Sequence, residues 1–352
     1  MQIKDSQLLT GFRDFVGLLD EMWPEAQEYA DQALSQLNPR YVHMYTSEND
    51  PPYRIDRTVD PRSGSFGTVH KTTNNTDGDA YAVKVFHNVS WNNNRQTILR
   101  EIGVLELCMH RNIVKLVEAY EVATVPDVLY VVMTPWVPVT LDDLICNPDP
   151  LRRKTFPWFA AGMESTLDCA HRLMRELADG LAYLHDLSLK HKDLKPNNIL
   201  LQHATDAHRI TPLITDFGVS KVFRVGGATR YTNSTYEFLS LEQLNHEESS
   251  LKSDIWQLGC CYSYMLCVAS GGSRAANTLC DSYMCQLRAC NIAREAEHFK
   301  KALHQLVVYH EQNRPREKRM LHMVADGMLD LNPSTRLDID MIRDQMASLQ
   351  EA

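Results

Sequence analysis

Residues 189–200, Leu-Lys-His-Lys-Asp-Leu-Lys-Pro-Asn-Asn-Ile-Leu, place three kinds of polar side chain in one short segment. Asp193 can accept a proton, Lys195 can neutralise an anion, and Asn198 offers a hard amide oxygen of the kind that Mg²⁺ binds. An Asp-Phe-Gly sequence follows and supplies a second hard oxygen ligand at Asp216. Each signal by itself is usually a chance spacing or a turn. The two signals in this order favour a catalytic centre.

This pair of motifs resembles the catalytic loop and the metal-binding aspartate of protein kinases, with residues 191–193 at the start of the loop. The resemblance implies transfer of the γ-phosphoryl group of ATP, a reaction in which the protein contributes mainly positioning and charge neutralisation. Asp193 would orient the attacking hydroxyl and accept its proton, and Lys195 would neutralise the migrating group. Asn198 and Asp216 would hold Mg²⁺.

The phosphate-binding part of the site is expected upstream. Residues 63–69, Ser-Gly-Ser-Phe-Gly-Thr-Val, would form a turn between two strands, where glycines let backbone amides approach phosphates closely. The kinase pattern Gly-x-Gly-x-x-Gly-x-Val would put its first glycine at Arg62, so this loop departs from the family there. Taken alone, the segment also fits an ordinary hairpin turn.

Alternation in residues 80–86 predicts a strand that carries Lys84 on one face. Residues 98–105 have helical spacing, and Glu101 occupies the position that pairs with the strand lysine in kinases. That pair would hold Lys84 against the α- and β-phosphates. Glu106 is the competing acidic residue, but it lies on a different face of the predicted helix.

Residues 128–133 and 199–201 are short apolar runs that predict buried strands. The resemblance places Met133 at the back of an adenine pocket and residues 134–136 between two lobes. Pro135 has no amide, but it falls between the two positions that bind adenine through the backbone. The nucleotide-binding residues implied by the resemblance are Gly64, Ser65, Phe66, Gly67, Val69, Ala82, Lys84, Met133, Thr134, Trp136 and Leu200.

Residues 234–242, Ser-Thr-Tyr-Glu-Phe-Leu-Ser-Leu-Glu, are similar to the kinase pattern Gly-Thr-x-x-Tyr-x-Ala-Pro-Glu, with Ser-Leu-Glu in place of Ala-Pro-Glu. The resemblance implies that Glu242 pairs with Arg336 and that Asp254 caps the catalytic loop. Both roles are structural.

Lys195 and Thr235 match the serine/threonine form of the family, which implies serine and threonine hydroxyls of proteins as acceptors. Lys192 stands where kinases switched by phosphorylation of the activation segment usually have arginine. Lysine lacks the planar fork that grips a phosphate, so a weaker phosphorylation switch is predicted.

Composition places few further limits on function. The chain has 352 residues and a formal net charge of -9, which argues against nucleic acid as the main partner. No run approaches the roughly 18 apolar residues of a membrane span, and residues 1–10 lack the features of a secretory signal. Nine scattered cysteines lack the spacing of zinc ligands, so reduced, packed thiols are expected in a cytoplasmic or nuclear protein.

The resemblance implies an α+β, two-lobed protein-kinase fold, with an antiparallel sheet and one helix in the small lobe and a large, mainly helical lobe. The small lobe would span residues 51–135 and the large lobe residues 136–352, with an inserted helical region near 271–320. Residues 1–50 would be a leader and linker. Apolar residues at helical spacing predict a helical hairpin in the leader, which would dock on the kinase body or bind a partner or a second copy.

Two other functions remain open at this point. A pseudokinase scaffold is suggested by the missing glycine at Arg62 and by Ser-Leu-Glu at 240–242. A kinase-like enzyme acting on a small molecule such as choline or an aminoglycoside is disfavoured, because those relatives generally lack Asp-Phe-Gly together with a segment like 235–242. The basic residues at 314–319 fit a nuclear signal or the solvated start of a helix after Pro315.

Overall fold

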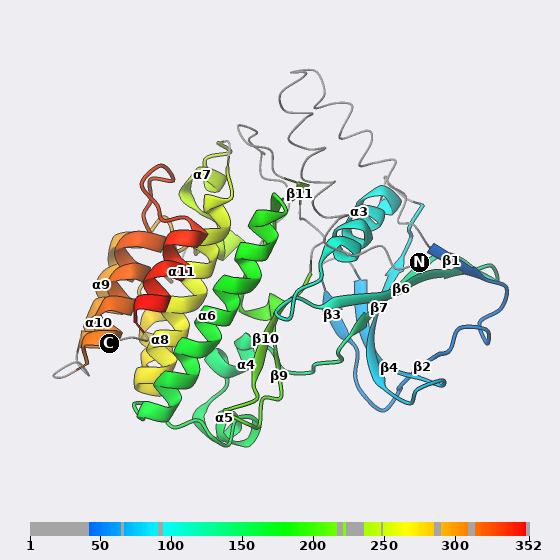
Figure 1. Cartoon of the computed structure of the whole chain (residues 1–352), viewed down its shortest axis with the longest axis horizontal. Helices are drawn as coiled ribbons and strands as arrows, with labels where there is room; N and C mark the ends of the chain where they lie inside the picture. The colour runs from blue at the N-terminus through cyan, green and yellow to red at the C-terminus, as the bar shows by residue number, and fades with distance from the viewer. Residues whose placement is uncertain are drawn as a thin grey trace. The chain divides into compact units, whose positions relative to one another are not determined.

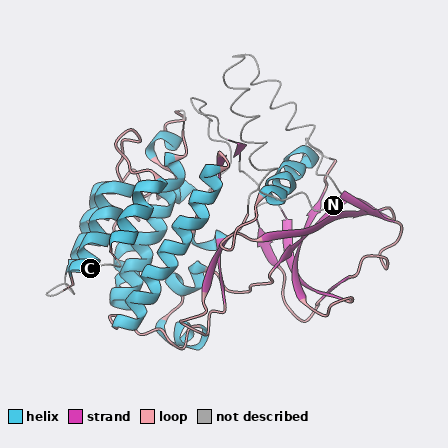
Figure 2. Ribbon diagram, viewed as in Figure 1, coloured by secondary structure: helices cyan, strands magenta, loops and turns pink. Residues whose placement is uncertain are grey.

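The computed structural model describes residues 42–64, 67–90, 94–216, 221–222, 236–247, 249–284, 290–308 and 314–349. The predicted leader hairpin lies outside these residues. The described chain divides into two compact units. The first contains the residues up to Asp79, Val83–Leu107 and Leu116–Val132, and the second contains Ala80–Ala82, Cys108–Lys115 and the chain from Met133 onward. Figure 1 labels the elements, and Figure 2 shows that strands dominate the first unit and helices the second.

The first unit contains a seven-stranded sheet in the order β1-β6-β7-β5-β4-β2, in which β3 also pairs with β4. Both β2 and β3 run antiparallel to β4. One helix, α3, accompanies the sheet. The elements are β1 Val42–Tyr45, β2 Tyr53–Ile55, β3 Arg62–Gly64, β4 Gly67–Asn74, β5 Ala80–His87, β6 Lys115–Val122, β7 Val125–Thr134 and α3 Asn94–Leu107.

Strand β1 corrects the prediction for residues 42–45 alone, which fall inside the predicted leader and linker at 1–50, and it adds a parallel strand to the predicted antiparallel sheet. Val42 pairs with Ala119 and Tyr45 with Val122, parallel to β6. The Tyr45 ring meets Tyr120 edge-on at 5.3 Å, and its hydroxyl donates to Glu118 Oε1 at 3.0 Å. Four residues, Val-His-Met-Tyr, are too short a run for alternation to identify a strand, so the contacts with β6 define β1.

Two glycines of this unit differ in the space around them. A Cβ at Gly67 would lie 2.5 Å from the carbonyl oxygen of Val85, whereas a Cβ at Gly103, inside α3, would meet nothing within 4 Å. We expect Gly67→Ala to lower the free energy of unfolding by about 1–3 kcal/mol through overpacking. Gly103→Ala should raise it by up to about 1 kcal/mol, because alanine favours a helix interior. Urea denaturation of both variants measures the difference, and equal effects would contradict the crowding at Gly67.

The second unit is built mainly from helices. Two short antiparallel strand pairs, β8 with β11 and β9 with β10, accompany them. The helices are α4 Leu141–Cys146, α5 Asp149–Thr155, α6 Glu164–Asp186, α7 Leu241–Leu244, α8 Lys252–Asp281, α9 Ala296–Val308, α10 Pro315–His322 and α11 Ile339–Ser348. The strands are β8 Leu189–Lys190, β9 Ile199–Gln202, β10 Thr211–Ile214 and β11 Lys221–Val222.

Helix α8 lies at the centre of the second unit. Every residue from Ser253 to Ser270 is buried, and helical backbone is interrupted at Gly272, which has φ 66° and ψ −156°. Cys260, Cys261 and Cys267 are buried in this helix, and all eight cysteines in the described residues are free thiols. In the described part of the chain, no helix is long and apolar enough to cross a membrane.

Candidate active site

Lys84 and Glu101 form a buried ion pair in the first unit. Lys84 lies on β5 and Glu101 on α3, and the distance from Nζ to Oε1 is 2.7 Å. Both side chains are only 5% exposed. Glu106, the competing acidic residue, is exposed on α3. A buried carboxylate this close holds the ammonium group in one position, so Lys84 is preorganised to meet an anion.

The segment proposed to cover the phosphates forms a hairpin between β3 and β4. Gly64 pairs with Gly67, and Arg62 pairs with Val69 in the antiparallel register. Ser65 and Phe66, at the turn itself, lie outside the described residues. Ala82, a further predicted site residue, is buried on β5.

The loop after β8 brings Asp193, Lys195 and Asn198 together in the second unit. Lys195 Nζ lies 2.9 Å from Asp193 Oδ2. The Asn198 amide nitrogen donates to Asp193 twice, to the carbonyl oxygen at 2.8 Å and to Oδ2 at 3.2 Å. Asp193 and Asn198 are buried, and Lys195 is partly buried. The carboxylate of Asp193 is therefore fixed by a cation and an amide in a position where it can accept a proton.

Asp216 is held near this loop through its neighbour in the chain. The Thr215 amide donates to the Asn198 carbonyl oxygen at 3.0 Å, and the His191 ring lies 3.0 Å from the Thr215 carbonyl oxygen. Asp216 has φ 66° and Lys192 has φ 74°. Left-handed backbone at non-glycine residues tends to occur at functional sites, where the surrounding structure enforces it.

Asp254, on α8, caps the catalytic loop as predicted. Its carboxylate accepts from the backbone amides of His191 at 2.9 Å and Lys192 at 2.8 Å. The His185 ring lies 3.2 Å from the same carboxylate. Burial alone would raise the pKa of Asp254, but the His185 hydrogen bond and the nearby Lys190 and His191 outweigh it, so the pKa lies below its ordinary value. Asp254 therefore stays charged and holds the loop backbone.

Gln257 supports the same loop and was missed by the sequence motifs. Its Oε1 accepts from the Leu194 amide at 2.9 Å, and its Nε2 donates to the Lys192 carbonyl oxygen at 2.9 Å. These two bonds flank Asp193 on both sides. One sequence feature could have indicated Gln257. It is a glutamine in a mostly apolar helix, and because it follows Asp254 by three residues it lies on the same helix face. Gln257 is a positioning residue for the loop.

Asn291 is a second residue that no motif indicated, and it lies in the predicted inserted region near 271–320. Its amide nitrogen donates to the carbonyl oxygens of Tyr236 at 2.5 Å, Leu239 at 3.2 Å and Glu237 at 3.3 Å. Asn291 is buried. The region therefore braces the backbone immediately before Ser240.

Apart from Ala82 on β5, the residues predicted to surround adenine lie in two segments of the second unit. Met133, Thr134 and Trp136 are buried or half-buried at the end of β7 and just beyond it, where the Thr134–Pro135 peptide is cis. Leu200 is half-buried on β9 and bridges to Thr140. The contacts of the predicted site residues thus form two groups, one centred on Lys84 and one on Asp193.

Residues 62–346 match the family described as "Protein kinase domain". This chain belongs to the protein kinase domain family. Serine/threonine-protein kinase H2 of Homo sapiens is 30% identical over 240 residues, 67% of this chain and 56% of that protein. Serine/threonine-protein kinase H1 of Mus musculus is 28% identical over 264 residues, 70% of this chain and 57% of that protein. Probable serine/threonine-protein kinase fhkE of Dictyostelium discoideum is 28% identical over 212 residues, 58% of this chain and 27% of that protein. The chain spans at most 57% of these three relatives.

The kinase domain is anchored by a buried pair between Glu242 and Arg336. Two parallel hydrogen bonds join the guanidinium and the carboxylate, at 2.7 and 3.1 Å. Burial would raise the pKa of Glu242, but Arg336 lowers it below its usual value. Ser240, which replaces the alanine of the family pattern, donates through its amide and its hydroxyl to Gln243 Oε1, both at 3.0 Å. The serine at position 240, where the family pattern has alanine, therefore has a structural role as the cap of α7.

The donor set of the kinase domain fits a magnesium ion. The side-chain nitrogen of Asn198 donates to Asp193, so the side-chain oxygen of Asn198 points away from Asp193. Asp216 adds a half-buried carboxylate. No group of three or more His, Cys, Asp or Glu side chains is arranged to hold a metal within the described ranges. Mg²⁺ binds through few protein oxygens and keeps other positions for water and phosphate, so two protein ligands suit it.

We expect Gln257→Met to lower kcat by about tenfold, the effect of a loss near 1.4 kcal/mol in the transition state. Methionine keeps the length of the side chain but removes the hydrogen bonds to the Leu194 amide and the Lys192 carbonyl, which flank Asp193. The KM for ATP should change little. Steady-state kinetics of peptide phosphorylation measure both, with Gln345→Met on the exposed face of α11 as the control. A lower melting temperature with unchanged kcat would show that Gln257 contributes to the stability of the fold and not to the rate of transfer.

Proposed function

We propose that this chain is a protein serine/threonine kinase that transfers the γ-phosphoryl group of ATP to hydroxyl groups of protein substrates. The observation that carries the proposal is the cluster of Asp193, Lys195 and Asn198, joined by hydrogen bonds and an ion pair of 2.8 to 3.2 Å. Membership of the protein kinase domain family supports it.

The residues of the chain have separate tasks in this proposal. Asp193 orients the acceptor hydroxyl and takes its proton as the oxygen attacks phosphorus. Lys195, 2.9 Å from Asp193, neutralises charge on the migrating group. Lys84, fixed by Glu101, binds the α- and β-phosphates. Mg²⁺, when bound, neutralises phosphate oxygens and orients them.

Asn198 and Asp216 are the residues proposed to hold Mg²⁺. Met133, Thr134, Trp136, Ala82 and Leu200 are proposed to surround adenine, since they occupy matching positions on the strands that the family uses. Serine and threonine are the proposed acceptors because Lys195 matches that class and because the three relatives above are named serine/threonine-protein kinases.

A pseudokinase scaffold is the second candidate. Arg62, on β3, stands where the family has its first loop glycine, so the loop over the phosphates departs from the family pattern. The five polar residues on which transfer depends are nevertheless all present: Lys84, Glu101, Asp193, Asn198 and Asp216. Their presence favours catalysis over scaffolding.

Incubation of the full chain with γ-labelled ATP, Mg²⁺ and a generic basic protein tests the proposal. Label on serine and threonine of the protein is the expected result. Nucleotide binding in a thermal-shift assay without any label transfer would favour the pseudokinase. Label that appears on choline or an aminoglycoside, and not on protein, would overturn the assignment of the acceptor.

A further inference from the structure

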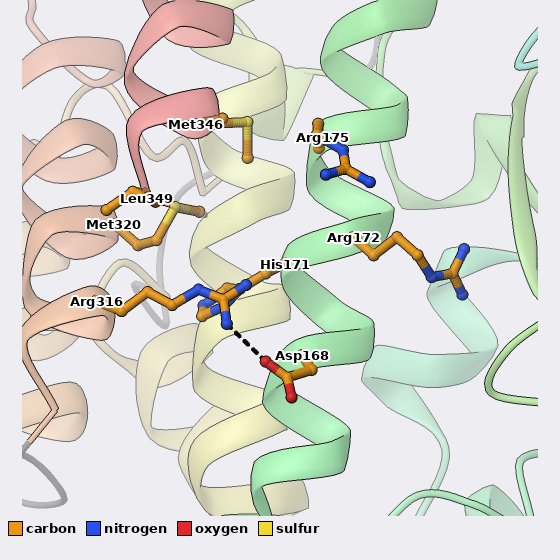
Figure 3. A pocket seen from close by; sticks show the side chains of 8 residues that line it. All are labelled: Asp168, His171, Arg172, Arg175, Arg316, Met320, Met346 and Leu349. Carbon is orange, nitrogen blue, oxygen red and sulfur yellow. Dashed lines mark hydrogen bonds and ion pairs between the residues drawn. The ribbon is translucent and has the colours of Figure 1, made fainter. Parts of the chain in front are cut away.

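A cavity of about 120 Å³ lies in the second unit, lined by residues of α6, α10 and α11 (Figure 3). None of the residues assigned above to catalysis or nucleotide binding lines it. Its α6 wall is polar and carries Asp168, His171, Arg172 and Arg175. Arg316 enters from α10 and reaches Asp168.

His171 is the first sign that this cavity takes a ligand. The side chain is buried, with 5% of its surface exposed, and neither ring nitrogen has a hydrogen-bond partner among the described residues. Burial, together with the positive charge of Arg316, lowers the pKa of His171 to about 4, against the opposing effect of Asp168. The ring is therefore neutral near pH 7 and presents one N–H donor. Buried polar groups without a partner are uncommon, because they lose hydration and gain nothing in return.

The charges around the cavity leave one cation uncompensated. Arg172 pairs with Glu176 at 3.0 Å, a carboxylate that the exposed Arg111 also contacts at 3.1 Å, and Arg316 pairs with Asp168 at 2.6 Å. Arg175 forms no hydrogen bond or ion pair with any described residue, although it is half-buried. The Nε of Arg316 is also buried without a partner in the described chain. The unpaired guanidinium of Arg175, together with the unpaired donors on His171 and Arg316, matches a monoanion.

The opposite wall limits the kind of anion. Met320 of α10 and Met346 and Leu349 at the end of α11 supply an apolar surface, and all three are at least 93% buried. Figure 3 shows these side chains on one side of the cavity and Arg172 and Arg175 on the other. A ligand that satisfies both walls has an anionic end and a short apolar end. Its buried part is limited to about six heavy atoms, since a cavity of about 150 Å³ holds benzene.

We propose that this cavity binds a small aliphatic monocarboxylate. The carboxylate lies among Arg175, the Nε of Arg316 and the His171 ring, and the aliphatic part contacts Met320, Met346 and Leu349. Arginine suits this role because its guanidinium remains charged and donates several hydrogen bonds to one carboxylate. The two methionines can adapt to the shape of the aliphatic chain.

Butyrate is the probe that tests the proposal, added to the full chain at constant ionic strength and followed by calorimetry. One saturable site per chain is expected, with binding of n-butanol and of inorganic phosphate weaker by about tenfold or more, because each lacks one of the two features. If phosphate binds as tightly as butyrate or more tightly, the cavity is a site for a simple anion and not for an organic carboxylate, and the proposal is overturned. Absence of saturable butyrate binding would also overturn it, leaving a cavity filled by water only.

The location is tested with protein carrying labelled methionine methyl groups. Nuclear Overhauser effects from butyrate to the methyl groups of Met320 and Met346 are expected on the unaltered chain, and their absence at saturation would place the site elsewhere. Arg175→Gln should weaken butyrate binding by about tenfold. Arg274→Gln, at an exposed position on α8, should leave it unchanged. Full affinity in Arg175→Gln would overturn the proposal. If Arg175→Gln fails to fold, the affinities of the unaltered chain for butyrate, n-butanol and phosphate test the proposal instead.

Discussion

Asp193→Asn is expected to reduce the rate of phosphoryl transfer by about 10²–10⁴-fold, the contribution of a positioned general base. Asparagine has nearly the same shape as aspartate and can still accept from Lys195 and Asn198, which lie 2.9 and 3.2 Å from Oδ2. It cannot take the proton of the acceptor hydroxyl. Nucleotide affinity should stay within a few-fold, because the residue is not assigned to nucleotide binding. Transfer rates and nucleotide titrations of the same preparation measure both quantities.

Asp186→Asn is the matched control for this substitution. Asp186 is exposed at the end of α6, three residues before β8. The control should transfer phosphate at the parental rate. If Asp193→Asn also turns over at the parental rate, Asp193 is not the base, and the proposed mechanism fails at its central step.

Lys84→Met is expected to affect both activity and stability. Loss of the ammonium group removes the proposed contact to the α- and β-phosphates, so transfer should fall by at least about 100-fold. The substitution also removes the buried 2.7 Å ion pair between Lys84 and Glu101. Removing one member of a buried ion pair typically costs about 3–5 kcal/mol of the free energy of unfolding. Label transfer and urea denaturation measure the two effects separately.

Two further variants separate the causes. In the double variant Lys84→Met/Glu101→Leu, stability should largely recover because both charges of the buried pair are removed together, whereas activity should not. Lys71→Met breaks a more exposed pair between β4 and Asp56, at 3.0 Å, and should lower stability far less than Lys84→Met because solvent screens that pair. Normal activity in Lys84→Met would assign the phosphate contact to another lysine.

Patterns close together in the sequence determined the chemical identity of the candidate site. Asp193, Lys195 and Asn198 lie within six residues, so one loop conformation is enough to bring them together. Lys84 and Glu101 are 17 residues apart, but a strand followed directly by a helix limits where their side chains can meet. Alternating and apolar runs likewise predicted β5, β7 and β9.

Tertiary structure alone decided the contacts between distant segments. Gln257 reaches the catalytic loop across 63 and 65 residues, and Tyr45 reaches Glu118 across 73. Neither contact leaves a periodic signal, because the partners belong to different elements whose packing depends on the whole core. The cavity beside His171 has the same origin, since α6, α10 and α11 each look like ordinary amphipathic helices in the sequence. A local pattern records the conformation of its own segment, whereas the pairing of segments depends on the packing of the complete chain.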